Sequence, residues 1–310
     1  MTRPGGRGGT DVMPAISTKS CLERVPRGPI RHVLGWARRG LMKLVVRGGV
    51  ALVCSLPRGI WLRVREASGL VRRLDYARHP IYLRVDSWIE NDVRLHSCAK
   101  EPGTVDWIET WFRPGEVFYD IGACVGAYSL VAYRFLGGAI RVYAFEPGFV
   151  TFPQLCQNIR LNLAQDAIVP VPVALSDRTG LFDFCYQNLS TGGALHALET
   201  PVNQDGRPFA PIFRLPALSY RLDEFVSAFG LPKPNHVKID VDGGEMRILH
   251  GAERTLSDPA LRSLLLEVNQ GQGNFAECEA LLTRSGFVLH SVRNENRLYY
   301  RPGPDCGEGG

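Results

Sequence analysis

From residue 117 onward, short apolar segments alternate with longer segments of helical periodicity. Amphipathic segments follow four of the five apolar ones, and two further strand-like segments, GFVLHSV and RLYYRP, end the pattern as an antiparallel pair. Such alternation predicts an α/β fold with a doubly wound, mostly parallel sheet and helices on both faces. The five apolar segments are VFYD (117–120), RVYAFE (141–146), AIVPVPVAL (167–175), HVKIDV (236–241) and LRSLLLEV (261–268).

The chain has 310 residues, of which 45% are hydrophobic, so it can bury a large core. We expect one domain over residues 80–303, interrupted by an insertion at about 180–220 of largely loop-like composition. A loop of that length inside a compact domain is usually functional. The segment STGG at 190–193 could make the insertion flexible enough to close over a ligand. Outside the domain we expect a disordered tail (1–27), a basic helical extension (28–79) and a second tail (304–310).

Basic residues are concentrated in the N-terminal part. Residues 1–90 hold 17 Lys and Arg against 6 Asp and Glu, whereas the remainder holds 19 against 25. This asymmetry suggests peripheral contact with an anionic membrane, or else surface helices that pack on the domain with arginines outward. The longest uncharged apolar run, GGVALVCSLP, is too short to span a bilayer, which needs about 20 residues. Trp36 and Trp61 do not interleave with the charges, so no specific nucleic-acid partner is expected.

The eight cysteines form no CxxC pair and no cluster with zinc spacing. The first residues, MTRPGGRGGT, are polar and lack the apolar stretch of a secretory signal. We therefore expect reduced thiols and a cytoplasmic location, with membrane-peripheral attachment as an alternative.

The first predicted strand ends in YDIGACVGAYSL (119–130), where Asp120 precedes a turn with Gly122 and Gly126. The dinucleotide fingerprint GxGxxG has a glycine where Cys124 stands, and the Asp120 carboxylate would repel a pyrophosphate. A cationic nucleoside without phosphate fits better. S-adenosylmethionine has an ammonium, a sulfonium, a ribose and a carboxylate that a helix N-terminus can hold.

Two further acids follow the next strands. Glu146 stands 26 residues after Asp120, at a strand end where an acid can accept hydrogen bonds from both ribose hydroxyls. An NAD enzyme uses an acid at the same place, so Glu146 alone does not discriminate between the cofactors. Asp177 follows the third strand and could reach the adenine amino group, or serve only as a turn residue.

The fourth predicted strand leads into KIDVDGGE, which supplies Asp240, Asp242 and Glu245 as candidate catalytic residues. Methyl transfer to a hydroxyl is an in-line displacement that needs a base for the proton. Lys238 and Asp240 would point to one side of a strand, and so would Asp242 unless it already belongs to the turn that follows. Acids this close should raise at least one pKa, which suits a base, but they could equally hold a divalent cation. A third reading of Glu245 is that it caps the next helix.

Two residues are candidates for the acceptor side. Glu267 ends the fifth strand and could line the acceptor pocket, while His196 lies in the insertion and could act as a base. Either could instead be structural.

Five segments occur together in this chain and in one order: CAKEPGTVDWIETWFRPGEVFYDIGACVGAYSLVA, VYAFEP, VPVALSDRTG, SYRLDEF and HVKIDVDGGEMRILHGA. Over residues 80–290 the chain resembles the FkbM family of class I S-adenosylmethionine-dependent methyltransferases. The resemblance implies a Rossmann-like, seven-stranded fold and O-methylation of hydroxyls, often on sugars or secondary metabolites. It places Asp120, Gly122 and Gly126 in the first cofactor motif, Glu146 on the ribose, and residues 240–245 in the KIDVEGxE motif.

Two positions depart from the family pattern. Cys124 stands where the family has asparagine, and Asp242 stands where it has glutamate. The acceptor expected from the resemblance is a small molecule or a glycan: a sugar, a lipid-linked glycan or a polyketide hydroxyl. Two alternatives remain, a nicotinamide-dependent oxidoreductase on a similar sheet and a non-catalytic member that only binds the cofactor.

Overall fold

The computed structural model describes residues 69–203, 206–268 and 275–302, with isolated positions between 48 and 63. The chain divides into two compact units, Met1–Ser68 and Gly69–Gly310, and the second carries the elements described below. The predicted tails, most of the basic extension and its membrane contact fall outside the described residues and stay predictions. Among the described residues, no helix is long and apolar enough to cross a bilayer.

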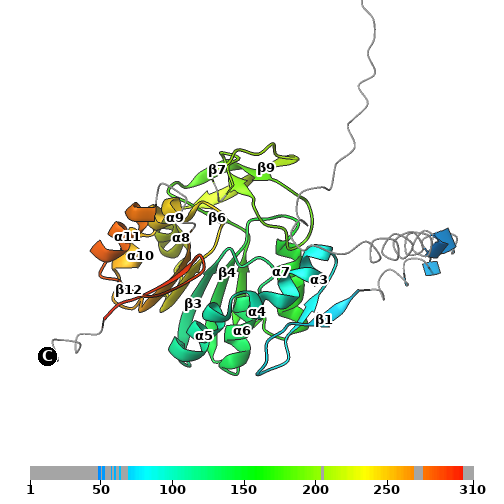
Figure 1. The fold of residues 1–310 in the computed structure, drawn as a ribbon, viewed down its shortest axis with the longest axis horizontal. Coiled ribbons are helices and arrows are strands. Elements are labelled where there is room, and N and C mark those ends of the chain that lie inside the picture. Colours follow the sequence, from blue (N-terminus) through cyan, green and yellow to red (C-terminus); the bar gives the residue numbers. More distant parts are fainter. Residues whose placement is uncertain are drawn as a thin grey trace, which may run out of the picture. The chain divides into compact units, whose positions relative to one another are not determined.

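A seven-stranded sheet forms the centre of the second unit (Figure 1). Five neighbouring strands are parallel, and the last two strands of the chain pair antiparallel at one edge. This confirms the predicted mostly parallel sheet with a C-terminal antiparallel pair. In spatial order the strands are β12 (Val288–Arg293), β13 (Asn296–Tyr300), β11 (Ser263–Glu267), β10 (His236–Ile239), β3 (Glu116–Ile121), β4 (Ile140–Phe145) and β5 (Ile168–Val171).

Helices cover both faces of this sheet, as the alternating pattern predicts. Successive strand residues point to opposite faces, so Phe118 belongs to one buried apolar cluster and Tyr119 to the other. The Phe118 cluster includes residues of α5 (Pro102–Trp111), α6 (Ala127–Phe135) and α7 (Phe152–Leu161). The Tyr119 cluster includes residues of α8 (Leu222–Phe229), α9 (Glu245–Gly251), α10 (Glu253–Ser257) and α11 (Phe275–Arg284).

The insertion forms a second sheet, with strand order β6-β9-β7-β8. The third apolar segment, expected as one strand, contributes β5 to the main sheet and β6 to this one. Pro170 and Pro172 lack the N–H that a continuous ladder needs, so the chain leaves the main sheet there. The strands of the second sheet are β6 (Ala174–Leu175), β7 (Gly180–Tyr186), β8 (Ala197–Leu198) and β9 (Phe213–Tyr220).

The compact unit begins at Gly69, before residue 80 where the sequence placed the start of the domain. β1 (Val71–Arg73) pairs antiparallel with β2 (Tyr82–Arg84). The side chains of Asn158 in α7 and of Asn162, just after this helix, accept hydrogen bonds from the backbone of β2. All three residues of β1 are exposed, so the sequence carries no apolar alternation that would reveal this strand. Three short helices follow: α3 (Trp88–Asp92), the 3₁₀ helix η1 (Arg94–His96) and α4 (Ser97–Lys100).

Gly122 joins the ends of β3 and β10 by a close backbone approach. Its φ is 80°, and a Cβ at this position would overlap the carbonyl oxygen of Asp240. A side chain here would therefore separate the turn after β3 from the turn after β10.

Gly122→Ala is expected to lower the free energy of unfolding by more than about 3 kcal/mol, because left-handed strain and overlap with Asp240 add together. Gly115→Ala is the matched control, since Gly115 has a φ of 86° but a Cβ added to it would have no heavy atom within 4 Å. The free energy of unfolding of Gly115→Ala should fall by only about 1–2 kcal/mol, the cost of the left-handed strain alone. Urea denaturation of both variants measures the difference, and equal losses would contradict the close approach.

Candidate functional site

Residues 122–126, here called the glycine turn, follow β3 with left-handed backbone at three positions. The φ angles are 80° at Gly122, 52° at Cys124 and 86° at Gly126. A Cβ on Gly126 would lie 2.6 Å from Leu155 Cδ1, so both glycines of the GxxxG spacing are required by geometry. Cys124 is the unusual residue here, because asparagine tolerates a left-handed conformation better than cysteine does. The backbone thus explains why an asparagine suits this position.

Glu146, at the end of β4, braces the glycine turn. Its buried carboxylate accepts hydrogen bonds from the backbone N–H of Cys124 at 3.0 Å and of Gly148 at 2.7 Å. Burial raises the pKa of Glu146 to about 7. Burial also raises the pKa of the Cys124 thiol to about 12, so this cysteine stays protonated at neutral pH. Cys124 therefore acts on the site through its backbone N–H.

Asp120 is buried directly before the glycine turn. Its Oδ2 accepts a hydrogen bond of 2.6 Å from Ser129 Oγ, whereas Oδ1 has no hydrogen-bond partner among the described residues. Burial raises the pKa of Asp120, although Lys238 and Ser129 oppose that shift. An unpartnered, buried carboxylate oxygen at this point is suited to a ligand that carries a donor or a positive charge.

A buried lysine of β10 and the acid that follows the strand form an ion pair beside Asp120. The Nζ of Lys238, a fully buried side chain, lies 2.5 Å from Asp240 Oδ2 and 5.1 Å from the centre of the Tyr128 ring. Burial alone would lower the pKa of Lys238, but Asp240, Glu101 and Asp120 outweigh it and raise that pKa. Burial would likewise raise the pKa of Asp240, but Lys238 outweighs it and the pKa falls to about 2. Asp240 is therefore ionised at neutral pH.

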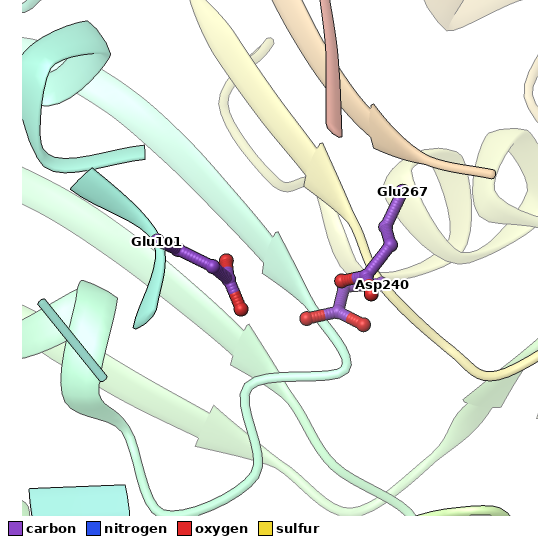
Figure 2. A group of neighbouring side chains, drawn as sticks. All are labelled: Glu101, Asp240 and Glu267. Carbon is purple, nitrogen blue, oxygen red and sulfur yellow. The ribbon is translucent and has the colours of Figure 1, made fainter. Parts of the chain in front are cut away.

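Three carboxylates from different elements converge here, and we call Glu101, Asp240 and Glu267 the acidic cluster (Figure 2). One oxygen of each lies within 4.8 Å of the others. Burial and the charge of Asp240 raise the pKa of Glu267 to about 9. Glu267 thus keeps its proton at neutral pH and donates it in a hydrogen bond to Asp240.

A divalent cation in the acidic cluster would have to compete with Lys238, whose Nζ already lies 2.5 Å from Asp240 Oδ2. The sequence suggested a different set, in which Asp240, Asp242 and Glu245 would share an ion. In the structure Asp242 has a φ of 60°, which takes it out of the strand alternation that would have aligned it with Asp240.

Asp242 and Glu245 instead bind backbone N–H groups. Asp242 Oδ2 accepts from Leu195 at 2.6 Å, and Glu245 Oε1 accepts from Gly243 at 2.8 Å, just before α9. Burial, followed by the charge of Asp240, raises the pKa of Asp242 to about 6. Burial raises the pKa of Glu245 to about 7. Both carboxylates can therefore change protonation near neutral pH.

Asp177 and His196 have protein partners of their own. Asp177 Oδ1 accepts from Ser176 Oγ at 2.8 Å and from Arg247 Nε at 2.9 Å, and these contacts outweigh burial to lower the pKa of Asp177. The His196 ring lies 5.0 Å from that of Tyr186. Burial lowers the pKa of His196 to about 4, so the ring is neutral at neutral pH.

Two charged residues near the site were missed in the sequence. Glu101 stands just before α5 in the acidic cluster, and Arg94 in η1 interacts electrostatically with Asp240, Asp242 and Glu146. Both come from residues 88–101, where short helices follow one another without a sustained periodicity. Only the packing of these helices brings the two side chains to the end of the sheet.

The chain is similar to known methyltransferases. A family model described as the methyltransferase FkbM domain matches residues 120–289. Hexuronic acid methyltransferase AglP of Haloferax volcanii is 26% identical over 183 residues, covering 59% of this chain and 68% of that protein. The 31-O-demethyl-FK506 methyltransferase FkbM of Streptomyces tacrolimicus is 27% identical over 197 residues, covering 57% and 74%.

Solved structures are more distant. A methyltransferase FkbM from Methylobacillus flagellatus has a TM-score of 0.42 at 17% identity, over 61% of this chain and 45% of that one. A SAM-dependent methyltransferase from Agrobacterium tumefaciens has a TM-score of 0.43 at 10% identity, over 76% and 71%.

Cys124→Asn is expected to stabilise the protein by up to about 1 kcal/mol, because asparagine relieves left-handed strain while the backbone N–H still reaches Glu146. Cys124→Val should be destabilising, since a β-branched side chain suits this conformation least. Thermal denaturation of the two variants measures both effects. If asparagine destabilised as strongly as valine, the contacts of the thiol would matter more than the backbone.

Glu267→Gln is expected to raise the melting temperature at pH 8 and to have little effect at pH 4.5. The pKa of Glu267 is about 9 in the folded protein and about 4.3 in an unfolded chain, so its favourable contribution is lost as pH rises between these values. Glutamine can still donate to Asp240 but cannot ionise. Melting curves of both proteins between pH 4.5 and 8.5 test this, and a constant difference would contradict the shared proton.

Proposed function

The chain belongs to the methyltransferase FkbM family, and from this premise we propose that it transfers a methyl group from S-adenosylmethionine to a hydroxyl. The proposed acceptor is a sugar, a glycolipid or a secondary metabolite. The names of two relatives support this class, since one gives a hexuronic acid and the other an O-demethylated FK506. The observation that carries the proposal is the glycine turn, held by Glu146 and adjoining the unpartnered oxygen of Asp120.

The residues present fit this cofactor. The glycine turn has no side chains at Gly122 and Gly126, so its backbone can approach a ligand closely. It precedes the N-terminus of α6. Asp120 and Glu146 put two buried carboxylates beside it, which favour an ammonium, a sulfonium and hydroxyl donors over a pyrophosphate. Asp120 disfavours the pyrophosphate of a nicotinamide dinucleotide, whereas Glu146 is compatible with either cofactor.

When bound, S-adenosylmethionine supplies a methyl carbon on a positively charged sulfur. The residues of this chain must orient the acceptor hydroxyl and remove its proton while the new C–O bond forms. Asp240 stays ionised because of Lys238, so it can accept a hydrogen bond from the hydroxyl and orient it.

A carboxylate with a pKa of about 2 does not hold a proton at neutral pH. We therefore assign proton acceptance to the neighbouring carboxylates Asp242 and Glu245, whose pKa values are about 6 and 7. These values match the operating range of a general base. Glu267, which is protonated, keeps Asp240 in place through their shared hydrogen bond.

Asp240→Asn is expected to lower methyl transfer by about 10²–10⁴-fold, because the hydroxyl loses its orienting carboxylate. Its affinity for S-adenosylhomocysteine should change by less than about threefold, a loss below 1 kcal/mol. The measurements are calorimetry with S-adenosylhomocysteine and transfer of a labelled methyl group to extracted glycans, lipids and small metabolites. Asp106→Asn, an exposed acid paired with Arg293, is the matched control.

A well-folded wild-type protein that binds no S-adenosylhomocysteine would overturn the proposed function. Binding without transfer to any acceptor class would support a non-catalytic member of the family. If Asp240→Asn lost binding and transfer to the same degree, Asp240 would belong to the cofactor side of the site.

A further inference from the structure

Residues 188–195, here called the insertion loop, are packed against the helices that precede α5. Ser87 Oγ donates to the carbonyl oxygen of Thr191 at 2.7 Å, and Thr191 Oγ1 donates to Glu90 Oε2 at 2.8 Å. At its other end, Leu195 N–H donates to Asp242. The insertion loop therefore joins residues 87–94 to the turn that follows β10.

Gly192 is the point where the insertion loop meets the glycine turn. Its φ is 70°, and a Cβ there would lie 2.9 Å from Glu90 Cγ, 3.2 Å from Arg94 Cγ and 3.5 Å from Val125 Cγ1. Arg94 Nε donates to the carbonyl oxygen of Gly192 at 2.9 Å. These contacts hold the Arg94 side chain between the insertion loop and the glycine turn.

The guanidinium of Arg94 interacts electrostatically with carboxylates on two sides of the site. Glu146, which braces the glycine turn, is one of them, and Asp240 and Asp242, which follow β10, are the others. In the part of the chain that the structure describes, it forms no ion pair with any of these carboxylates. Its one hydrogen bond there, to Gly192, uses Nε, so the two terminal nitrogens of the fork remain for a ligand.

The charges around the site indicate the kind of ligand that Arg94 would bind. Three cations act on the site carboxylates within the described residues: Lys238 is buried against Asp240, Lys100 pairs with Glu101, and Arg94 is the third. A ligand carboxylate that entered this acidic site would be repelled unless a cation received it. Arg94 is half-buried and offers the planar fork that binds a carboxylate through two hydrogen bonds.

We propose that Arg94 binds a carboxylate of a ligand in this site and holds it against the insertion loop through Gly192. The inference rests on the proposed function, in which two ligands can supply such a group. One is the amino-acid moiety of S-adenosylmethionine, and the other is a uronic acid in the acceptor. Arg94 is thereby a positioning and specificity residue that lies outside the stretch matched by the family model.

Calorimetry with two nucleosides tests whether the carboxylate that Arg94 binds belongs to the cofactor. S-adenosylhomocysteine carries the carboxylate, whereas 5′-methylthioadenosine lacks the whole amino-acid moiety. Arg94→Gln is expected to lower the affinity for S-adenosylhomocysteine by about 10- to 100-fold, the range of a charge-assisted hydrogen bond. The affinity for methylthioadenosine should not change. Arg94→Lys should recover part of the loss because it keeps the charge. Arg78→Gln, an exposed arginine paired with Glu109, is the control.

A second experiment tests whether the carboxylate belongs to the acceptor. D-glucuronate and D-glucose are titrated by NMR into wild type and Arg94→Gln at saturating S-adenosylhomocysteine. Selective loss of glucuronate binding, with unchanged affinity for the nucleosides, assigns the carboxylate to the acceptor and supports the proposal.

Two results would overturn the role of Arg94. One is that Arg94→Gln loses as much affinity for methylthioadenosine as for S-adenosylhomocysteine, which would indicate a purely structural role. The other is unchanged binding of both S-adenosylhomocysteine and glucuronate. Wild-type protein that binds no S-adenosylhomocysteine would contradict the proposed function instead, and glucuronate titrated without nucleoside would then decide on Arg94.

Discussion

A single buried ammonium group allows several carboxylates to gather at one end of the sheet. Lys238 lies at 2.5 Å from Asp240 and is itself fully buried, so water screens its charge poorly. It keeps Asp240 ionised, and burial together with the charge of Asp240 keeps the proton on Glu267. Without such a cation, the acidic cluster would be a set of mutually repelling groups and not a site with one defined anionic oxygen.

The second constraint is the backbone contact between Gly122 and the carbonyl of Asp240. β3 and β10 are neighbours in the sheet, although more than 100 residues separate them in the chain. Their contact places the glycine turn beside the acids of β10, and ligands of open parallel sheets bind at this edge. The donor half and the acceptor half of the proposed reaction therefore meet because of one residue without a side chain.

The sequence predicted the elements whose signals are local. The apolar runs that became β3, β4, β10 and β11, and the acids that end them, were readable because each strand contains its own pattern. Arg94 and Glu101 were not readable in this way, since they stand in short helices whose place depends on packing against distant segments. The chain's passage from β5 to β6 was also missed, because a continuous apolar run hides the effect of two prolines.

By itself, the sequence determined the alternation of strands and helices in the main sheet, the glycine turn and the resemblance to a methyltransferase family, because periodicity and turn chemistry act over a few residues. Only the tertiary structure decided which acids share a proton. It joined Asp240 to Glu267 and Glu101 and turned Asp242 and Glu245 toward backbone N–H groups. The physical reason is that protonation depends on burial and on distances between charges, and both arise when remote segments pack together.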